Sequence, residues 1–201
     1  MDKNSYALGM SIAHNMLQSG VKEVAFEDFV AGLKATLTRQ EPAISYQEAG
    51  DILDKYFQQL QEKQAAEQAE VAEVMKKDGV NFLAENAKKE GVKVLPSGLQ
   101  YKVIKEGNGK KPKLTDKVKC LYEGTFVDGE KLDSSYDRKQ PAVFGVNQVI
   151  PGWTEALQLM SEGSEWMLYI PYNLGYGEAG AQGAIPPYAA LIFKVELIEV
   201  L

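Results

Sequence analysis

The titratable and nucleophilic side chains of this sequence do not assemble into any of the usual catalytic sites. His14 is the only histidine, which excludes a histidine-based triad and a multi-histidine metal site within one chain. Cys120 is the only cysteine, which excludes an internal disulfide and a multi-cysteine zinc site. Because Cys120 alternates with hydrophobic neighbours, we interpret it as a small buried side chain. We therefore expect neither a metal nor a cofactor.

Two other patterns have simple structural interpretations. Residues 175–180 match the glycine pattern G-x-G-x-x-G, which binds dinucleotides when a helix begins at the glycines. Here Pro186 and Pro187 follow within a few residues, so we interpret the match as accidental. The carboxylates Asp133 and Asp137 lie in a segment rich in Ser, Asp and Arg, where we expect them to stabilise turns.

An apolar pocket is the kind of site that remains. Aromatic and aliphatic residues are predicted to lie on loops in the second half of the chain. Such sets more often form an ordinary core, so the pocket interpretation needs further support. The members are Tyr122, Leu132, Phe144, Val149, Ile150, Trp153, Tyr176, Ile185 and Phe193.

The elements that must position this set belong to the second of two halves that meet near Pro96. Residues 1–95 carry six of the 18 glycines and one of the eight prolines, and residues 96–201 carry the rest. The first half can therefore form long helices, whereas the second is typical of strands and turns.

The second half is predicted to be an antiparallel sheet wrapped around one short helix, which makes the fold class α+β. Asp128-Gly129 predicts a hairpin turn, and the helix is expected over residues 153–160. Strands are expected over residues 99–105, 117–126, 142–145, 165–170 and 191–201.

Three helices are predicted in the first half. Apolar residues recur at helical spacing over residues 5–18 and again over residues 26–37. Ser45 and Glu48 fit a capping box at the start of a third helix. Beyond its first turns this helix is rich in Gln, Glu, Ala and Lys and has almost no apolar stripe, so we interpret it as a solvated strut. With about 30 to 40 residues it would span roughly 45–60 Å, with a bend allowed next to Gly79.

The apolar side chains of these helices need a partner surface, because a polar strut would hold them away from the second half. A second copy of the same chain is the most economical partner, so we expect a symmetric homodimer. The predicted domains are a helical dimerisation domain over residues 1–60, a long connecting helix over residues 61–95 and a β-rich domain over residues 96–201. The side chains that need covering are Phe26, Phe29, Leu33, Leu37, Ile52, Leu53 and Phe57.

Charge and hydropathy restrict the partners and the location. The 22 basic and 28 acidic residues give a net charge of −6, which argues against nucleic acid as a partner. No apolar run approaches the roughly 18 to 20 residues that form a membrane span. The N-terminal residues show no export signal, so we expect a cytoplasmic protein if Met1 is the true start. If a signal has been removed, we expect the periplasm or another part of the envelope.

Seven of the nine pocket residues occur in five short segments that together resemble the signature of FKBP-type peptidyl-prolyl cis-trans isomerases. These segments follow the family's order over residues 97–201, which makes the resemblance very specific. They are Tyr122-Glu123-Gly124, Leu132-Asp133-Ser134-Ser135, Val149-Ile150-Pro151-Gly152-Trp153, Leu174-Gly175-Tyr176-Gly177 and Ile185-Pro186-Pro187.

The first half resembles the N-terminal extension of the bacterial macrophage-infectivity-potentiator-like subgroup of that family. This subgroup is known for homodimers with intertwined N-terminal helices, which agrees with the dimer expected from the apolar faces. The motifs are Ser5-Tyr6-Ala7-Leu8-Gly9, Glu85-Asn86-Ala87-Lys88-Lys89-Glu90-Gly91-Val92 and Ser97-Gly98-Leu99-Gln100-Tyr101.

The resemblance implies a role for each pocket residue. Trp153 would form the floor beneath a substrate proline. The backbone amide of Ile150 would bind one substrate carbonyl, and the Tyr176 hydroxyl would bind another. Ile185 would belong to a loop that overhangs the groove. The walls would be Tyr122, Phe144, Val149, Ile150 and Phe193.

The resemblance also places Asp133 opposite the twisting amide, held by Tyr122 and Arg138. Two simpler alternatives stay open: Asp133 and Arg138 could form only a loop ion pair, and Trp153 could be only core. Leu132 stands where the family usually has Phe, and losing that aromatic ring could lower catalysis while keeping an apolar wall.

The leading hypothesis is an isomerase that acts on prolyl bonds in unfolded or nascent polypeptides and also serves as a chaperone, with two catalytic domains able to hold one chain. The alternative is a holdase that captures prolyl segments with weak turnover because of Leu132. A third interpretation treats the dimer as the function, and the presence of Asp133, Tyr176 and Trp153 argues against it. The resemblance further implies that macrolides such as tacrolimus and rapamycin bind the pocket.

Overall fold

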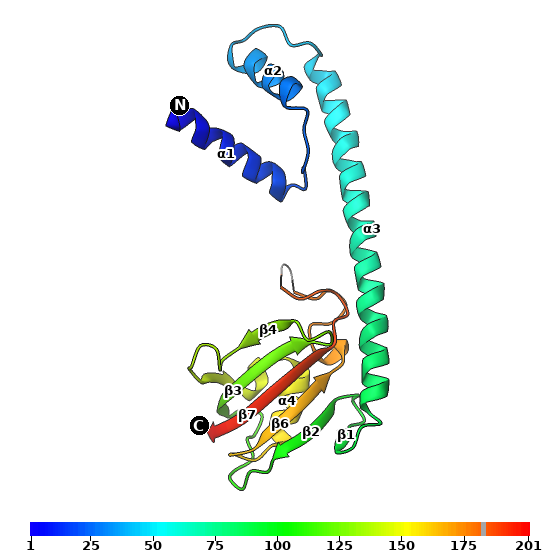
Figure 1. Cartoon of the computed structure of the whole chain (residues 1–201), viewed down its shortest axis with the longest axis vertical. Coiled ribbons are helices and arrows are strands. Elements are labelled where there is room, and N and C mark those ends of the chain that lie inside the picture. Colours follow the sequence, from blue (N-terminus) through cyan, green and yellow to red (C-terminus); the bar gives the residue numbers. More distant parts are fainter. Residues whose placement is uncertain (182–183) are drawn as a thin grey trace. The chain divides into compact units, whose positions relative to one another are not determined.

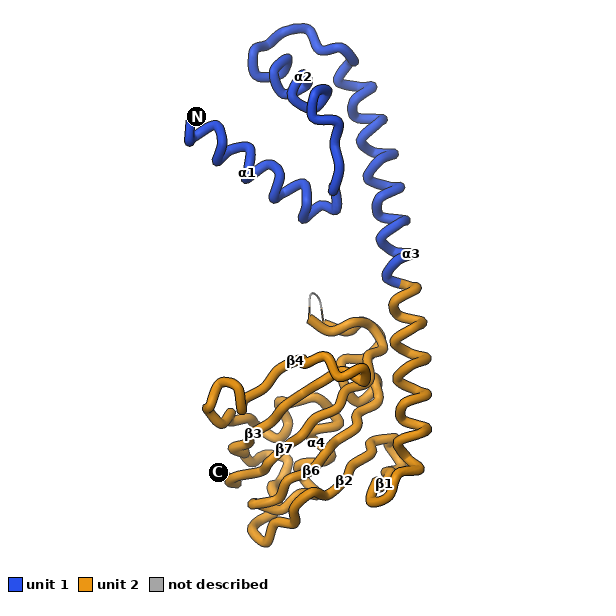
Figure 2. The backbone as a smooth tube through the Cα atoms, in the orientation of Figure 1, with its two compact units in different colours: residues 1–68 blue, residues 69–201 orange. Residues whose placement is uncertain are grey.

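The computed structural model describes residues 1–181 and 184–201 of the 201-residue chain. The chain divides into two compact units, Met1–Gln68 and Ala69–Leu201, and the boundary falls inside one long helix (Figure 2). No helix in the described part of the chain combines the length and the apolar character needed to cross a bilayer.

The N-terminal unit contains α1 (Lys3–Gln18), α2 (Phe26–Leu37) and the first part of α3 (Tyr46–Asn86) (Figure 1). Ser45 caps α3 as predicted, because its Oγ accepts a hydrogen bond from the backbone N–H of Glu48 at 3.1 Å. The three predicted helices are therefore confirmed, with bounds that differ by two residues or fewer for α1 and α2.

The apolar faces of these helices are uncovered within one chain. Neither α1 nor α2 contains a buried residue. The side chains of Phe26 and Leu37 are 75% and 80% exposed. In α3, Ile52 and Leu53 are each 50% exposed.

Helix α3 runs for 41 residues without a break, including at Gly79. The prediction of a solvated strut fails for its last turns, which carry a stripe of partly or fully buried residues. The stripe consists of Ala72, Met75, Lys76, Gly79, Phe82, Leu83 and Asn86. These positions repeat every three or four residues, so they share one face of the helix.

Two buried amides fix the end of α3 to the sheet. Asn86 is fully buried, and its Nδ2 donates to Oε1 of Gln100 at 3.0 Å. Nε2 of Gln100 donates in turn to the backbone carbonyl of Leu83 at 2.8 Å. Gln100 is the first residue of β2 (Gln100–Lys105), so these bonds join helix and strand.

The C-terminal unit combines the last turns of α3 with an antiparallel sheet, and α4 (Pro151–Leu159) packs against the sheet (Figure 1). Within the described residues the strand order is β1-β2-β6-β7-β3-β4, and β5 pairs with the remaining part of β3. Two short 3₁₀ helices, η1 (Val146–Gln148) and η2 (Tyr172–Leu174), follow β5 and β6. The other strands are β1 (Val92–Val94), β3 (Lys117–Phe126), β4 (Lys131–Ser134), β5 (Ala142–Gly145), β6 (Glu165–Ile170) and β7 (Leu191–Val200).

The core of this unit lies between the sheet and α4. Alternate residues of β3 and β6 are buried, as expected for strands with one face on a core. Cys120 on β3 is fully buried, which confirms its predicted place. Residues with no exposed surface include Leu99, Val118, Leu157, Met160, Leu168, Ile170, Val195 and Leu197.

The α+β fold class is confirmed, and β3, β5 and β6 have the predicted bounds. The hairpin turn at Asp128-Gly129 is also present, between β3 and β4. Strands β1 and β4 were not predicted, because β1 has only three residues and β4 contains a single apolar residue, Leu132. Helix α4 begins two residues earlier than predicted, at Pro151, where a proline suits the first turn.

Candidate functional site

A pocket of about 590 Å³ opens in the C-terminal unit and brings together ten of the eleven residues singled out in the sequence. The exception is Arg138, which contacts a wall residue. The lining residues come from β3, β4, β5, β7, η1, α4, the two residues between η1 and α4, and the segment between η2 and β7. They are Tyr122, Leu132, Asp133, Phe144, Gln148, Val149, Ile150, Trp153, Tyr176, Ala184, Ile185 and Phe193.

The floor of the pocket is Trp153, whose side chain is enclosed by three aromatic rings. Tyr122 and Phe193 each meet it edge to face with ring centroids 5.4 Å apart, and Phe144 does so at 5.7 Å. These are favourable geometries for aromatic pairs. Only 4% of Trp153 is exposed, so the floor of the pocket is also part of the core.

The start of α4 places Trp153 and Ile150 next to each other. The Trp153 backbone N–H donates to the Ile150 carbonyl at 2.9 Å, and Thr154 Oγ1 donates to the carbonyl of Val146 in η1 at 2.8 Å. In residues 1–181 and 184–201, no hydrogen bond from the Ile150 backbone N–H is found. This N–H lies at the end of the helix where the macrodipole is positive, so it suits a carbonyl oxygen.

Gly124 on β3 leaves room for the Phe193 ring. Any Cβ at position 124 would overlap the ring carbons of Phe193, because the two residues are paired across β3 and β7. A side chain there would push the ring away from its place beside Trp153. The glycine of the Tyr122-Glu123-Gly124 motif thus has a packing reason.

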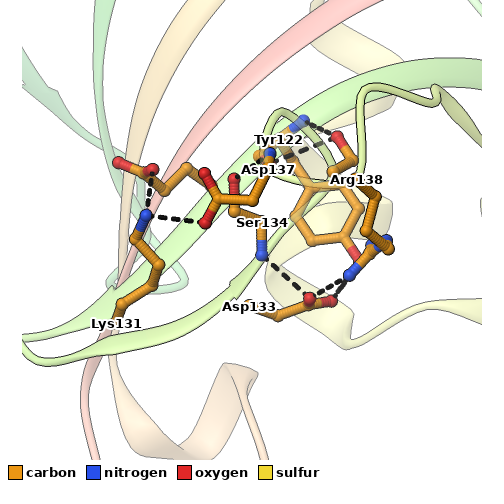
Figure 3. Close-up of polar contacts among 8 residues, drawn as sticks. Tyr122, Lys131, Asp133, Ser134, Asp137 and Arg138 are labelled. Atoms are coloured by element: carbon orange, nitrogen blue, oxygen red, sulfur yellow. Dashed lines mark hydrogen bonds and ion pairs between the residues drawn. The ribbon is translucent and has the colours of Figure 1, made fainter.

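A cluster of hydrogen-bonded polar residues forms one edge of the pocket, where Tyr122 and Asp133 line it (Figure 3). The Tyr122 hydroxyl donates to Oδ2 of Asp133, and Nη1 of Arg138 donates to Oδ1. Nη2 of Arg138 donates to the Tyr122 hydroxyl at 2.8 Å, and the backbone N–H of Ser134 donates to Oδ1 at 2.8 Å. Both carboxylate oxygens therefore accept hydrogen bonds from the protein itself.

These contacts fix the charge state of the edge. The hydrogen bond from Arg138 lowers the pKa of Asp133 most, and those from Tyr122 and Ser134 lower it further against the opposing effect of partial burial. Burial raises the pKa of Tyr122, and its hydrogen bond to Asp133 adds to this. At neutral pH the edge therefore presents a carboxylate and a neutral phenol.

The mouth of the pocket is formed by a segment that we call the pocket loop, residues 175–181 and 184–190. Tyr176 is 41% exposed, whereas Ile185 is only 7% exposed. Ala181 and Ile185 exchange two backbone hydrogen bonds of 2.9 Å. Gly180 has φ of +65°, and any Cβ there would overlap the Ile185 carbonyl, so a glycine is required.

Sequence reasoning missed two lining residues, Gln148 and Ala184. It considered large apolar side chains and charged groups, and neither residue belongs to those classes. The signal available for Gln148 was its position directly before Val149 and Ile150. Arg138 was expected to hold Asp133, and in the structure it binds that carboxylate without lining the pocket.

We expect Arg138→Met to raise the pKa of Asp133 toward its ordinary value of about 3.9, because the main cause of the lowering is removed. A carboxyl ¹³C NMR titration of the labelled protein measures this directly. Lys139→Met, which removes the adjacent exposed charge, should leave that pKa almost unchanged. An unaltered Asp133 titration in Arg138→Met would contradict the assigned cause.

Two families match the chain. Residues 108–198 match the family described as "FKBP-type peptidyl-prolyl cis-trans isomerase", and residues 1–103 match the "Domain amino terminal to FKBP-type peptidyl-prolyl isomerase". Together they cover almost the whole sequence. The pocket lies in the first of these regions.

Individual relatives are similar to this chain in sequence over nearly its full length. The chain is 43% identical over 197 residues to the "FKBP-type 22 kDa peptidyl-prolyl cis-trans isomerase" of Escherichia coli, covering 98% of this chain and 94% of that protein. It is 41% identical to the "Outer membrane protein MIP" of Legionella longbeachae, covering 99% and 85%.

A solved structure supports the same assignment. The crystal structure of FkpA from Escherichia coli matches with a TM-score of 0.76 at 34% identity, covering 98% of this chain and 95% of that one. Sequence and fold therefore agree from end to end. The chain belongs to the FKBP-type peptidyl-prolyl cis-trans isomerases and carries the amino-terminal domain that accompanies this family in its bacterial relatives.

Proposed function

We propose that the pocket above Trp153 is where this isomerase accelerates rotation about X–Pro bonds in folding polypeptides. The observation that carries the proposal is the enclosure of Trp153 by three aromatic rings next to a carboxylate that the protein has already saturated with hydrogen bonds. The Trp153 side chain offers a flat apolar surface for a proline ring. Asp133 contributes a negative charge, but its oxygens are already occupied by hydrogen-bond donors of the protein, so it does not accept a proton from the substrate.

A pocket of this kind can act on the amide through its polarity alone. Rotation has a barrier near 18–20 kcal/mol because it breaks amide resonance. The twisted amide has lost that conjugation and is less dipolar than the planar one. An apolar pocket therefore disfavours the twisted state less than the planar state. A thousandfold acceleration requires only about 4 kcal/mol.

The residues around the floor supply position and charge. The Ile150 N–H would bind one substrate carbonyl, and the Tyr176 hydroxyl at the mouth would bind another; both residues line the pocket. Asp133 faces the pocket as a fixed negative charge, because Arg138, Tyr122 and Ser134 occupy its oxygens. It acts through its field on the rotating amide and takes no proton.

Substrates of this site are prolyl segments of unfolded or nascent polypeptides, and macrolides such as tacrolimus and rapamycin are proposed to compete for the same pocket. The pocket volume of about 590 Å³ suits a proline ring with its neighbouring residues. The open mouth at Tyr176 leaves room for the chain to enter and leave. Residues 108–198, the part that matches the isomerase family, would carry this activity.

NMR exchange on a prolyl tetrapeptide, measured without a coupled protease, tests the assignment. We expect Tyr176→Phe to slow catalysed exchange by about two- to tenfold, since one hydrogen bond is lost, and Asp133→Ala to slow it by about ten- to a hundredfold, since a charged group is lost. Asp137→Ala is the matched control, because Asp137 pairs with Lys131 and does not line the pocket. Equal exchange in wild type and both site variants would refute the proposed site.

A second candidate function is a holdase that binds prolyl segments and releases them with little turnover. The observation that favours it is Leu132, an aliphatic residue on the pocket wall where the family usually has an aromatic ring. An aliphatic wall keeps the pocket apolar while making fewer specific contacts to a proline ring.

Leu132→Phe separates the two candidates. For a working isomerase we expect less than about a threefold rise in turnover, because the natural wall already supports catalysis. A rise of more than about tenfold with unchanged peptide affinity would instead identify a protein suited to holding. Tetrapeptide exchange and peptide titration measure the two quantities. Leu114→Phe, outside this pocket, controls for the added ring.

We also propose that residues 1–60 form a symmetric homodimer, residues 61–95 connect it and residues 96–201 carry the isomerase site. The support is the exposed apolar surface of α1, α2 and early α3, which one chain does not cover. Two sites in one dimer would hold a single unfolded chain more tightly than one site, which would give chaperone activity.

Sedimentation of the full chain checks the dimer. We expect a mass of twice 22.2 kDa for the wild type and 22.2 kDa for the double variant Phe26→Glu with Leu37→Glu, which places charges on the uncovered face. Lys34→Glu, on the same helix, is the control for added negative charge. Tetrapeptide exchange per chain should stay unchanged, because the pocket lies in the other unit. A monomeric wild type would exclude the dimer.

The compartment depends on whether an export signal precedes these residues in the gene. We propose the envelope where such a signal is encoded and the cytoplasm where it is not. A relative named as an outer membrane protein supports the first case. Fractionation of cells that express the native gene decides between them.

A further inference from the structure

The last turns of α3 contact the base of the pocket loop. Nζ of Lys76 lies 4.8 Å from the centre of the Tyr188 ring, a cation–π distance. One turn further along, Gly79 is buried against Ala190, and a Cβ at position 79 would lie 2.9 Å from the Ala190 Cβ. All four residues belong to the C-terminal unit, Ala69–Leu201.

Tyr188 closes the two ends of the pocket loop on each other. Its backbone N–H donates to the Gly177 carbonyl at 3.1 Å, and the Gly177 N–H donates to the Tyr172 carbonyl at 2.8 Å. Its ring meets the Tyr172 ring at 5.0 Å and an angle of 67°. Tyr188 also has φ of +56°, a conformation that a bulky residue keeps only when its surroundings impose it.

The closed base is directly connected to pocket residues. Gly177 follows Tyr176, and Tyr188 lies three residues after Ile185. Ala189 and Ala190 are 4% and 5% exposed, so the end of the loop is packed as tightly as the core. A shift of Tyr188 or Ala190 must therefore move the segments that carry Tyr176 and Ile185.

We propose that Lys76 and Gly79 are positioning residues for the isomerase site. They fix Tyr188 and Ala190 from the side of α3, and through them the substrate-binding residues Tyr176 and Ile185. The proposal rests on the function proposed above for that pocket. The end of the connecting helix is thereby part of the isomerase machinery, although it does not touch the substrate.

The residue types on α3 fit this role. A lysine over an aromatic face attracts the ring without needing a buried counter-ion. A glycine allows the helix backbone to approach Ala190 more closely than any other residue would.

A pair of adjacent lysines provides the test in the full chain. Lys76→Met removes the charge over Tyr188, whereas Lys77→Met removes an exposed charge from the next position of the same helix. Tetrapeptide exchange at a series of peptide concentrations separates KM from kcat. We expect Lys76→Met to raise KM by about two- to fivefold with little change in kcat, Lys77→Met to match the wild type, and Lys76→Arg to restore the wild-type KM.

A pair of helix glycines provides an independent test. Gly79→Ala forces α3 and Ala190 apart, whereas a Cβ at Gly50, in the same helix, meets nothing within 4 Å. We expect Gly79→Ala to raise KM and to shift the amide resonances of Tyr176 and Ile185, and Gly50→Ala to do neither. If Gly79→Ala does not fold, the comparison of Lys76→Met with Lys77→Met still tests the positioning role.

The outcomes distinguish this proposal from the one on which it rests. Unchanged KM and unchanged Tyr176 and Ile185 resonances in Lys76→Met, with exchange slowed in Tyr176→Phe, would overturn the positioning role and leave the site intact. Unchanged exchange in both variants would overturn the site and the positioning role together. A lower urea midpoint in Lys76→Met without a change in KM would indicate a purely structural contact and would also overturn the proposal.

Discussion

The edge-to-face packing of three aromatic rings on Trp153 is the interaction on which the rest of the site depends. The rings come from β3, β5 and β7, and Trp153 comes from α4. The pocket floor therefore exists only after the sheet and the helix have packed together. Since the tryptophan is almost fully buried, the same contacts stabilise the fold and shape the pocket.

The hydrogen bonds of the polar edge explain how the Asp133 carboxylate can lie beside the apolar floor formed by Trp153. An unpaired carboxylate is costly to remove from water. Here Arg138, Ser134 and Tyr122 all donate hydrogen bonds to Asp133 (Figure 3). About half of the Arg138 side chain is exposed, so the cation stays hydrated while the carboxylate faces the pocket.

Much of the C-terminal unit could be predicted from the sequence. Apolar and polar residues alternate along strands such as β3 and β6, and the family motifs indicate the pocket. The docked face of α3 could not be predicted. Three of its contacts depend on the charge of Lys76, the missing side chain of Gly79 and the amide of Asn86, which a search for an apolar stripe does not detect. The contact of Arg138 with Asp133 was expected from the family resemblance, and residue spacing alone would not have given it.

The unbroken course of α3 has a consequence for how such a chain can change in length. Within the C-terminal unit the end of α3 is fixed by the amides of Asn86 and Gln100, and Lys76 and Gly79 lie on the same helix. One residue inserted between Gly79 and Asn86 would turn Lys76 and Gly79 by about 100° about the helix axis and move them by about 1.5 Å along it. Both residues would then lose their contacts with Tyr188 and Ala190. We therefore expect this last part of α3 to tolerate no insertion or deletion.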